Sequence, residues 1–192
     1  MSNKSKTLLI LAMVITVMTV LLQLINNNLV TELLSYHRDL FISQLYWQWL
    51  TPSFVHANWN HWFLNIMNFY AMGFIFYTAW SLKKIFWLFS ISSFLITLGI
   101  YLFVPNINTY VGMSGVLYAF AVYGSLATFK EQKIVSVLVL TYVIAKLFFP
   151  YIVNDIIGIN KILKGLYIVT EAHLYGAIVG LGFYTIKKRF YS

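Results

Sequence analysis

The sequence predicts an all-α membrane protein, a bundle of six transmembrane helices with a long first external loop. Of its 192 residues, 60% are hydrophobic and only 9% are charged, and the mean hydropathy is +0.78. Soluble domains average about 45–50% apolar and about 25% charged residues. A chain this apolar is expected to be dissolved in lipid, and its length fits one domain over residues 1–192.

A helix needs about 20 mainly apolar residues to cross a hydrocarbon core about 30 Å thick. Six segments have this character: residues 7–25, 61–80, 85–103, 112–128, 134–152 and 168–186. The first is too long for the core of a secretory signal and lacks a small-residue cleavage site, so we expect it to stay as an anchor. In the long gap over residues 26–60, the aromatic segment 45–50 fits either a membrane interface or an ordinary external loop.

The basic residues predict the orientation. With both termini on one side, that side collects nine lysines and arginines, against three on the other. Positive charge favours the cytoplasmic side, so we expect a multi-pass protein of a bacterial inner membrane with cytoplasmic termini. The net charge of +8 is explained by this distribution and does not indicate nucleic-acid binding.

Reactive side chains gather at one depth. Polar groups near hydrocarbon are costly and are therefore candidates for function. The second, fourth and sixth segments all run inward, and His61, Ser114 and His173 lie at or near their starts. The chain has no cysteine, which excludes disulfides, thiolate nucleophiles and zinc–thiolate sites.

Ser114 opens the fourth segment in the sequence Gly112–Met113–Ser114–Gly115. A serine hydroxyl becomes nucleophilic when a base removes its proton, and a neutral imidazole is the commonest base. The glycines suit a sharp turn, and a helix N-terminus suits a developing oxyanion. Taken alone, the pattern is more typical of close helix packing.

His173 is the candidate base. It precedes Gly176 by three residues, and Gly176 with Gly180 forms a small-residue face that allows close approach of another helix. The alternative is a structural histidine bonded to a backbone carbonyl. Glu171 is two residues away and points elsewhere on a helix, so the simplest chemistry is a Ser–His dyad.

His61 and Asn65 project from one helical face and can both donate hydrogen bonds to an oxyanion. His56 lies off that face, in the loop. A metal site built from His56, His61 and His173 is the competing interpretation, but no carboxylate completes the ligand shell, and we expect neither metal nor cofactor. Lys146 is expected to snorkel or cap a polar contact.

Together these motifs resemble the rhomboid family of intramembrane serine proteases over residues 47–186. Gly112-x-Ser114-Gly115 is similar to the family's nucleophile motif, and Tyr118 matches the tyrosine that stacks on the catalytic histidine. The sixth segment matches through Ala172–His173-x-x-Gly176-x-x-x-Gly180. His56, His61 and Asn65 match the second-helix pattern, in which the second histidine and the asparagine help to form the oxyanion hole.

Three positions depart from the family pattern. The Trp-Arg pair of the first loop is Trp47–Gln48, the paired glycines of the second helix are Gly73–Phe74, and the glutamate beyond them is Tyr77. These positions concern loop anchoring and helix packing. The compact form also resembles the rhombosortase branch, thought to process proteins that end in a Gly-Gly motif, a transmembrane helix and a basic tail.

The resemblance implies hydrolysis of a peptide bond in or near the transmembrane helix of a membrane-protein substrate, at a site that opens to the periplasmic side. The substrate helix has to unwind locally, because a helical carbonyl is hydrogen-bonded and shielded. Two other functions were weighed. A non-catalytic rhomboid-like protein that binds membrane helices is disfavoured because Ser114 and His173 are both present, and a transporter because half-repeats and midplane charges are lacking.

Overall fold

Seven α-helices, three short 3-10 helices and one pair of strands form the chain in a computed structural model that describes residues 3–25, 28–39, 46–157 and 169–191. The α-helices are α1 (Asn3–Ile25), α2 (Asn28–Leu34), α3 (Trp59–Ile75), α4 (Leu82–Phe103), α5 (Ser114–Ala127), α6 (Lys133–Ile157) and α7 (Thr170–Tyr191). The 3-10 helices are η1 (Tyr46–Trp49), η2 (Thr51–Phe54) and η3 (Tyr77–Ala79), and the antiparallel strands are β1 (Tyr36–His37) and β2 (Thr109–Tyr110).

The six long helices coincide with the six predicted segments, which confirms a mainly helical protein. The first loop carries a short helix, α2, that hydropathy does not predict. The second segment also ends early: α3 stops at Ile75, the backbone leaves the helix at Phe76, and η3 follows. There the carbonyl of Met72 accepts two bonds, from the backbone N–H of Phe76 at 3.2 Å and from the indole N–H of Trp80 at 3.1 Å.

By length and composition, α1 and α4 are long and apolar enough to cross a membrane. Helix α5 is apolar but has only 14 residues, or about 21 Å at about 1.5 Å per residue. Six crossings therefore remain a prediction. The aromatic segment predicted over residues 45–50 is described from Tyr46 onward, where η1 leaves Tyr46 71% exposed and buries Gln48 completely.

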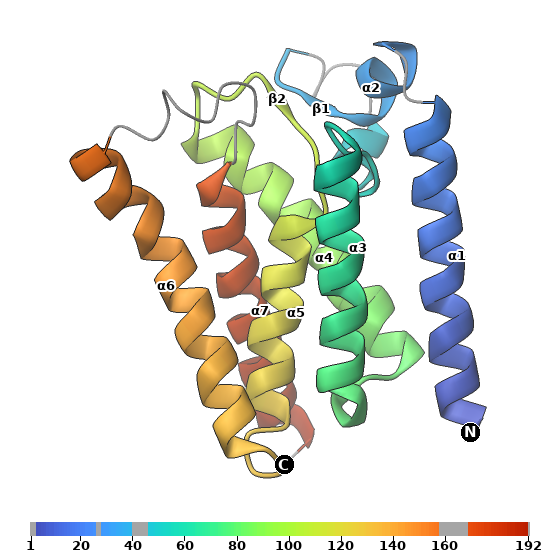
Figure 1. Cartoon of the computed structure of the whole chain (residues 1–192), viewed down its shortest axis with the longest axis vertical. Coiled ribbons are helices and arrows are strands. Elements are labelled where there is room, and N and C mark those ends of the chain that lie inside the picture. Colours follow the sequence, from blue (N-terminus) through green and yellow to red (C-terminus); the bar gives the residue numbers. More distant parts are fainter. Residues whose placement is uncertain (1–2, 26–27, 40–45, 158–168, 192) are drawn as a thin grey trace.

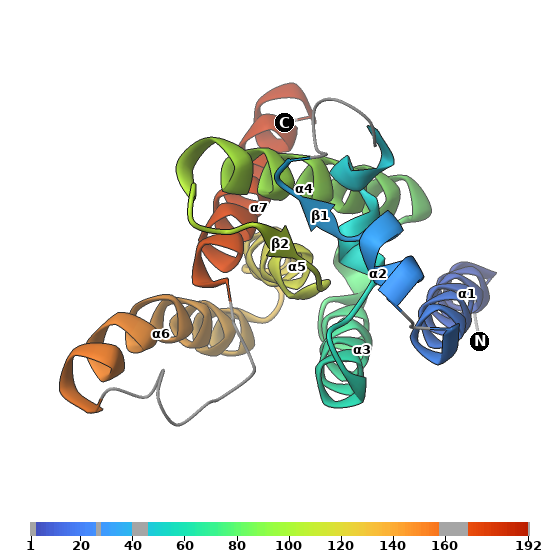
Figure 2. The ribbon, with the colours of Figure 1, turned by 90° about the horizontal axis from the view of Figure 1, so that it is seen from above.

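Helix α5 is the centre of the bundle. Seen from above, it lies among α3, α4, α6 and α7, with α1 beyond α3 at one edge and α6 at the opposite edge (Figure 2). Most of its side chains are buried, as expected for a helix that is apolar on all sides. In the side view, both chain ends lie at the lower end of the bundle, and α2, β1 and β2 lie at the upper end (Figure 1).

The outward faces of the peripheral helices are apolar. More than a third of the surface is exposed for many large hydrophobic side chains, among them Ile10, Val14, Val17 and Leu21 of α1, Phe63, Leu64 and Phe74 of α3, and Leu138, Ile144 and Phe148 of α6. Soluble monomers rarely expose contiguous apolar areas of this extent. Such a surface is suited to contact with hydrocarbon.

Candidate active site

The loop that leads into α5 fixes the position of Ser114. Gly112 has a φ of +119°, a conformation that favours glycine, and a Cβ at this position would lie 2.6 Å from Cε1 of His61. The Gly112 N–H donates to the carbonyl of Pro52 at 2.8 Å. Its carbonyl accepts a bond of 3.1 Å from the Tyr110 hydroxyl. Gly112 is thus held on both sides, two residues before Ser114.

The first loop is bound to this connection by a short sheet. Tyr36 pairs with Tyr110 and His37 with Thr109, so β1 of the first loop lies against β2. Residues 111–113, which join β2 to Ser114, are called the nucleophile loop below. The next residue, Arg38, donates from its guanidinium to four carbonyls at 2.8–3.2 Å. Those carbonyls belong to residues 100, 101, 104 and 107, at the C-terminal end of α4, where a cation is favourable.

Gln48 anchors the first loop from inside. Its side chain is fully buried, its amide oxygen accepts from the backbone N–H of His37 at 3.1 Å, and its amide nitrogen donates to the Glu32 carbonyl at 3.4 Å. Arg38 and Gln48 thus supply side-chain hydrogen bonds to the backbone that help to hold the loop. Although the family pattern has arginine where this chain has Gln48, the glutamine still binds the loop through a buried side chain.

Close packing of α7 against α5 fixes the position of His173. A Cβ on Gly176 would collide with the carbonyl oxygen of Gly115, and a Cβ on Gly180 with that of Ala119. In the other direction, a Cβ on Gly115 would lie 2.8 Å from the Ala172 carbonyl oxygen. Small residues permit this approach, which occurs beside Ser114 on α5 and His173 on α7.

The approach brings the two side chains into hydrogen-bond distance. Nε2 of His173 lies 2.9 Å from Oγ of Ser114, although 59 residues separate them along the chain. The ring of Tyr118 stacks on the imidazole, with centroids 4.4 Å apart and an angle of 9° between the planes. The Glu171 carboxylate instead accepts a bond from the Thr170 hydroxyl at 3.3 Å. In this geometry the imidazole can take the hydroxyl proton, and among the described residues no carboxylate is seen to orient it.

His61 and His56 lie on the opposite side of the nucleophile loop, at the start of α3. The Asn58 side chain caps this helix by accepting from the backbone N–H of His61 at 2.8 Å. The rings of His56 and His61 meet edge to face, with centroids 5.3 Å apart. Burial, and secondarily the neighbouring His61, lowers the pKa of His56 to about 3. His56 is therefore neutral over the physiological range.

Asn65 faces the Ser114 side of α3. It is buried, and its amide nitrogen donates one bond, to the His61 carbonyl at 3.0 Å. An amide carries two N–H groups, so one remains for another acceptor. Among the described residues, no three His, Asp or Glu side chains come together in a way that could hold a metal ion.

A cavity of about 250 Å³ adjoins the candidate dyad. Its lining comes from α3, α5 and α6 and includes Asn65, Asn68, Ser114, Tyr118 and Tyr142. Figure 2 shows α3 and α6 on either side of α5, and the cavity lies in that interval. Ser114 therefore borders a cavity between α3 and α6.

The structure brings together Ser114, His173 and Tyr118 on one side, and Gly112, His61 and His56 on the other. Sequence reasoning missed the contributions of Arg38 and Tyr110. Arg38 counts in the sequence only as a charge for orientation, yet it binds four carbonyls. The available signal was its position as an isolated arginine in a lightly charged loop.

Residues 43–190 match the family model described as Rhomboid domain. No curated protein matches the chain. The matched segment contains the nucleophile loop, both candidate catalytic residues and the helices α3 to α7 almost to the end of the last. Because the match covers most of the chain, the protein belongs to the rhomboid family, whose members are embedded in membranes and are in general serine intramembrane proteases.

Proposed function

We propose that this protein is an intramembrane serine endopeptidase that acts through a dyad of Ser114 and His173. The observation that carries the proposal is the 2.9 Å separation of His173 Nε2 and Ser114 Oγ. This is the distance at which a general base can accept a hydroxyl proton. The family in general consists of such proteases, and this chain retains both groups that the reaction requires.

In the first step, His173 Nε2 takes the Ser114 proton while Oγ attacks the carbonyl carbon of the scissile bond. The tetrahedral intermediate collapses when the protonated imidazole gives its proton to the leaving amine, so the C–N bond breaks and Ser114 remains acylated. Water from the cavity then attacks the acyl carbon. His173 again takes the proton and returns it to Oγ, releasing the carboxylate product and the free serine.

The negative oxygen of each intermediate requires hydrogen-bond donors. The first intrahelical bond of α5 runs from the Leu117 N–H to the Met113 carbonyl at 3.0 Å, so the N–H groups at the start of the helix have no intrahelical acceptor. We assign the Ser114 N–H, the second amide N–H of Asn65 and the imidazole of His61 to the oxyanion. Donors of this kind typically contribute about 3 kcal/mol each.

Substrate access is assigned to the side of the bundle between α3 and α6. The cavity there is lined by Asn65 and Asn68 on one helix and by Tyr142 and Val143 on the other, with Ser114 at its base. A transmembrane substrate helix can enter this interval from the bilayer. The segment to be cut has to be unwound, because only a carbonyl freed from its helical bond is open to attack.

For the membrane arrangement, we propose that all six long helices cross the bilayer as one domain over residues 1–192. The basic lower end, which carries both termini (Figure 1), is assigned to the cytoplasm of a bacterial inner membrane. The dyad then opens to the periplasmic side. As a narrower proposal, the substrates end in a Gly-Gly motif, a transmembrane helix and a basic tail. This narrower proposal rests on the resemblance to the rhombosortase branch, which includes the departures from the rhomboid pattern at Gln48 and Tyr77.

The decisive experiment compares wild type with Ser114→Ala and His173→Ala on a tagged membrane-protein substrate in proteoliposomes. We expect cleavage by wild type only, with equal expression and thermal stability for all three proteins. Covalent labelling by a fluorophosphonate should disappear in Ser114→Ala. Near wild-type cleavage by either variant would refute the dyad, and mass spectrometry of substrates that accumulate without Ser114 tests the Gly-Gly motif.

A further inference from the structure

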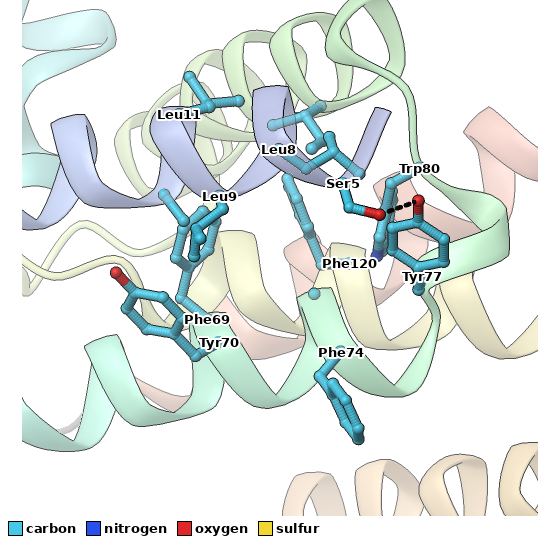
Figure 3. Close-up of a pocket in the computed structure, with 13 residues that line it drawn as sticks. Ser5, Leu8, Leu9, Leu11, Phe69, Tyr70, Phe74, Tyr77, Trp80 and Phe120 are labelled. Carbon is cyan, nitrogen blue, oxygen red and sulfur yellow. Dashed lines mark hydrogen bonds between the residues drawn. The ribbon is translucent and has the colours of Figure 1, made fainter. Parts of the chain in front are cut away.

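A second cavity lies at the opposite end of the bundle from the sheet, between α1 and α3. Its volume is about 520 Å³, within the range of about 300–1,000 Å³ of ligand pockets. Figure 3 shows Leu9 of α1 beside Phe69 and Tyr70 of α3, and Leu8 further along α1 toward Ser5; Trp80 and Phe120 complete the lining. Of the described residues that line it, none is acidic or basic.

The cavity reaches the outer surface of the bundle. Two of its lining residues, Leu9 and Phe74, are 41% and 87% exposed. Gly73 also lines it, and a Cβ on Gly73 would meet nothing within 4 Å. The space is thus open toward the part of the surface that faces hydrocarbon. An apolar chain could enter it directly from the bilayer, whereas a polar ligand would find almost no partner there.

Lysines surround the mouth of this cavity. Ser5, which lines it, bonds to the Tyr77 hydroxyl at 2.8 Å and lies between Lys4 and Lys6. Nζ of Lys4 donates to the Tyr77 carbonyl at 3.3 Å and lies 4.6 Å from the centroid of that ring. Lys6 is exposed and makes no hydrogen bond or ion pair with the described residues.

The opposite rim is also basic. Lys83 and Lys84 directly precede Ile85, a lining residue in the first turn of α4. Nζ of Lys84 donates to the Ala79 carbonyl at 3.0 Å, which holds it at the turn between α3 and α4, while Lys83 is exposed. Four lysines therefore lie within two residues of side chains that line this apolar cavity.

We propose that this cavity binds one acyl chain of an anionic phospholipid from the leaflet on the side of the chain's termini. The acyl chain lies between α1 and α3, against Trp80 and Phe120. The phosphate lies at the rim, bound by Lys4 and Lys6 and within the field of Lys83. The occupant is identified by this pairing: an apolar cavity open to lipid accepts hydrocarbon, and the lysines select a negatively charged headgroup.

The proposed lipid site is separate from the candidate dyad. None of its lining residues lines the cavity beside Ser114. Helix α1, which supplies one wall, precedes the segment matched to the rhomboid family. The site depends on the chain being in a membrane and not on proteolysis, so it can be tested on an inactive protein.

The test uses native mass spectrometry of full-length Ser114→Ala in detergent, titrated with dioleoyl phosphatidylglycerol or with dioleoyl phosphatidylcholine. We expect one tightly bound phosphatidylglycerol and much weaker phosphatidylcholine. Gly73→Leu fills the cavity and should weaken phosphatidylglycerol at least tenfold. Lys4→Gln and Lys6→Gln should weaken it about fivefold each, as expected for one surface lysine near an anionic lipid.

Two controls match these variants. Gly182→Leu places the same side chain on α7, where a Cβ also meets nothing within 4 Å, and Lys130→Gln removes another exposed lysine. Both should bind within twofold of the parent. Retention of phosphatidylglycerol by Gly73→Leu, or equal affinity for the two lipids, would overturn the proposal. A mass spectrum that shows a dimer of the chain without bound lipid would also overturn it.

A second measurement avoids substitutions altogether. Phosphatidylglycerol with a diazirine on its acyl chain is photoactivated with the protein, and the crosslinks are mapped by peptide sequencing. We expect them to concentrate on Leu8, Leu9, Tyr70 and Phe74. Crosslinks spread in equal proportion over the outer face of α4, at Phe86 and Trp87, would show lipid contact without a site and would refute the proposal even if Gly73→Leu failed to fold.

Discussion

The imidazole of His173 rests flat on the phenol ring of Tyr118, with ring centroids 4.4 Å apart. Tyr118 lies one turn after Ser114 on α5. A single helix therefore carries both the candidate nucleophile and the surface that orients the base. In the absence of a carboxylate partner, this stacking and the close packing of α7 restrict the imidazole.

Tyr118→Phe and Tyr118→Ala separate stacking from the hydroxyl. The phenylalanine keeps the ring, so we expect kcat within about threefold of wild type. The alanine frees the imidazole, and a misplacement of about 1 Å can cost about 10²-fold in rate. Cleavage of a tagged substrate in proteoliposomes measures both. Equal rates for alanine and wild type would mean that stacking does not position the base.

Gly176→Ala should separate α5 from α7. The added methyl group collides with the Gly115 carbonyl oxygen, and overpacking of this kind typically costs about 1–3 kcal/mol. We expect a lower unfolding midpoint and a loss of cleavage, because the distance between His173 and Ser114 increases. Gly182→Ala is the control, since a Cβ there meets nothing within 4 Å. The idea fails if both alanine variants behave alike.

Gln48→Leu removes the inner anchor of the first loop at nearly constant side-chain size. The His37 N–H and the Glu32 carbonyl lose their partner, and a buried unsatisfied group costs about 1–3 kcal/mol. Trp47→Phe is the control: it removes a bond to the Leu33 carbonyl from a side chain that is 44% exposed. Thermal unfolding should rank Gln48→Leu well below Trp47→Phe, and the reverse order would contradict this account.

His56 predicts how stability depends on pH. Its pKa is lowered from 6.5 to about 3 by burial and then by His61, so the folded protein binds fewer protons than the unfolded chain. The contribution of neutral His56 to the free energy of unfolding is fully present above about pH 6.5. It is lost as pH falls toward 3, by up to about 1.4 kcal/mol per pH unit. Unfolding midpoints from pH 7.5 to 5 should fall less steeply in His56→Gln. Parallel curves would exclude this role for His56.

The long helices could be predicted because hydropathy measures the transfer of side chains into lipid, and that transfer dominates their formation. Their ends could not. The early end of α3 is accompanied by a bond from the Trp80 indole to the Met72 carbonyl, a contact across eight residues that no running average detects. Helix α2 has only seven residues, too few to register in a search for membrane spans of about 20 apolar residues.

At the candidate site, the sequence indicates which side chains are suited to chemistry but not what the backbone does around them. The shared depth of Ser114 and His173 and the glycines of α7 were visible as patterns. The four carbonyls bound by Arg38 were not, because backbone acceptors carry no residue identity. The cavity beside Gly73 likewise depends on where α1 lies, which no local pattern specifies.

Arg38 joins parts of the chain that would otherwise move independently. Its guanidinium binds carbonyls at the C-terminal end of α4, while β1, the strand before it, pairs with β2, which leads to Gly112. A displacement of the first loop would therefore also displace β2 and the residues that lead from it to Ser114.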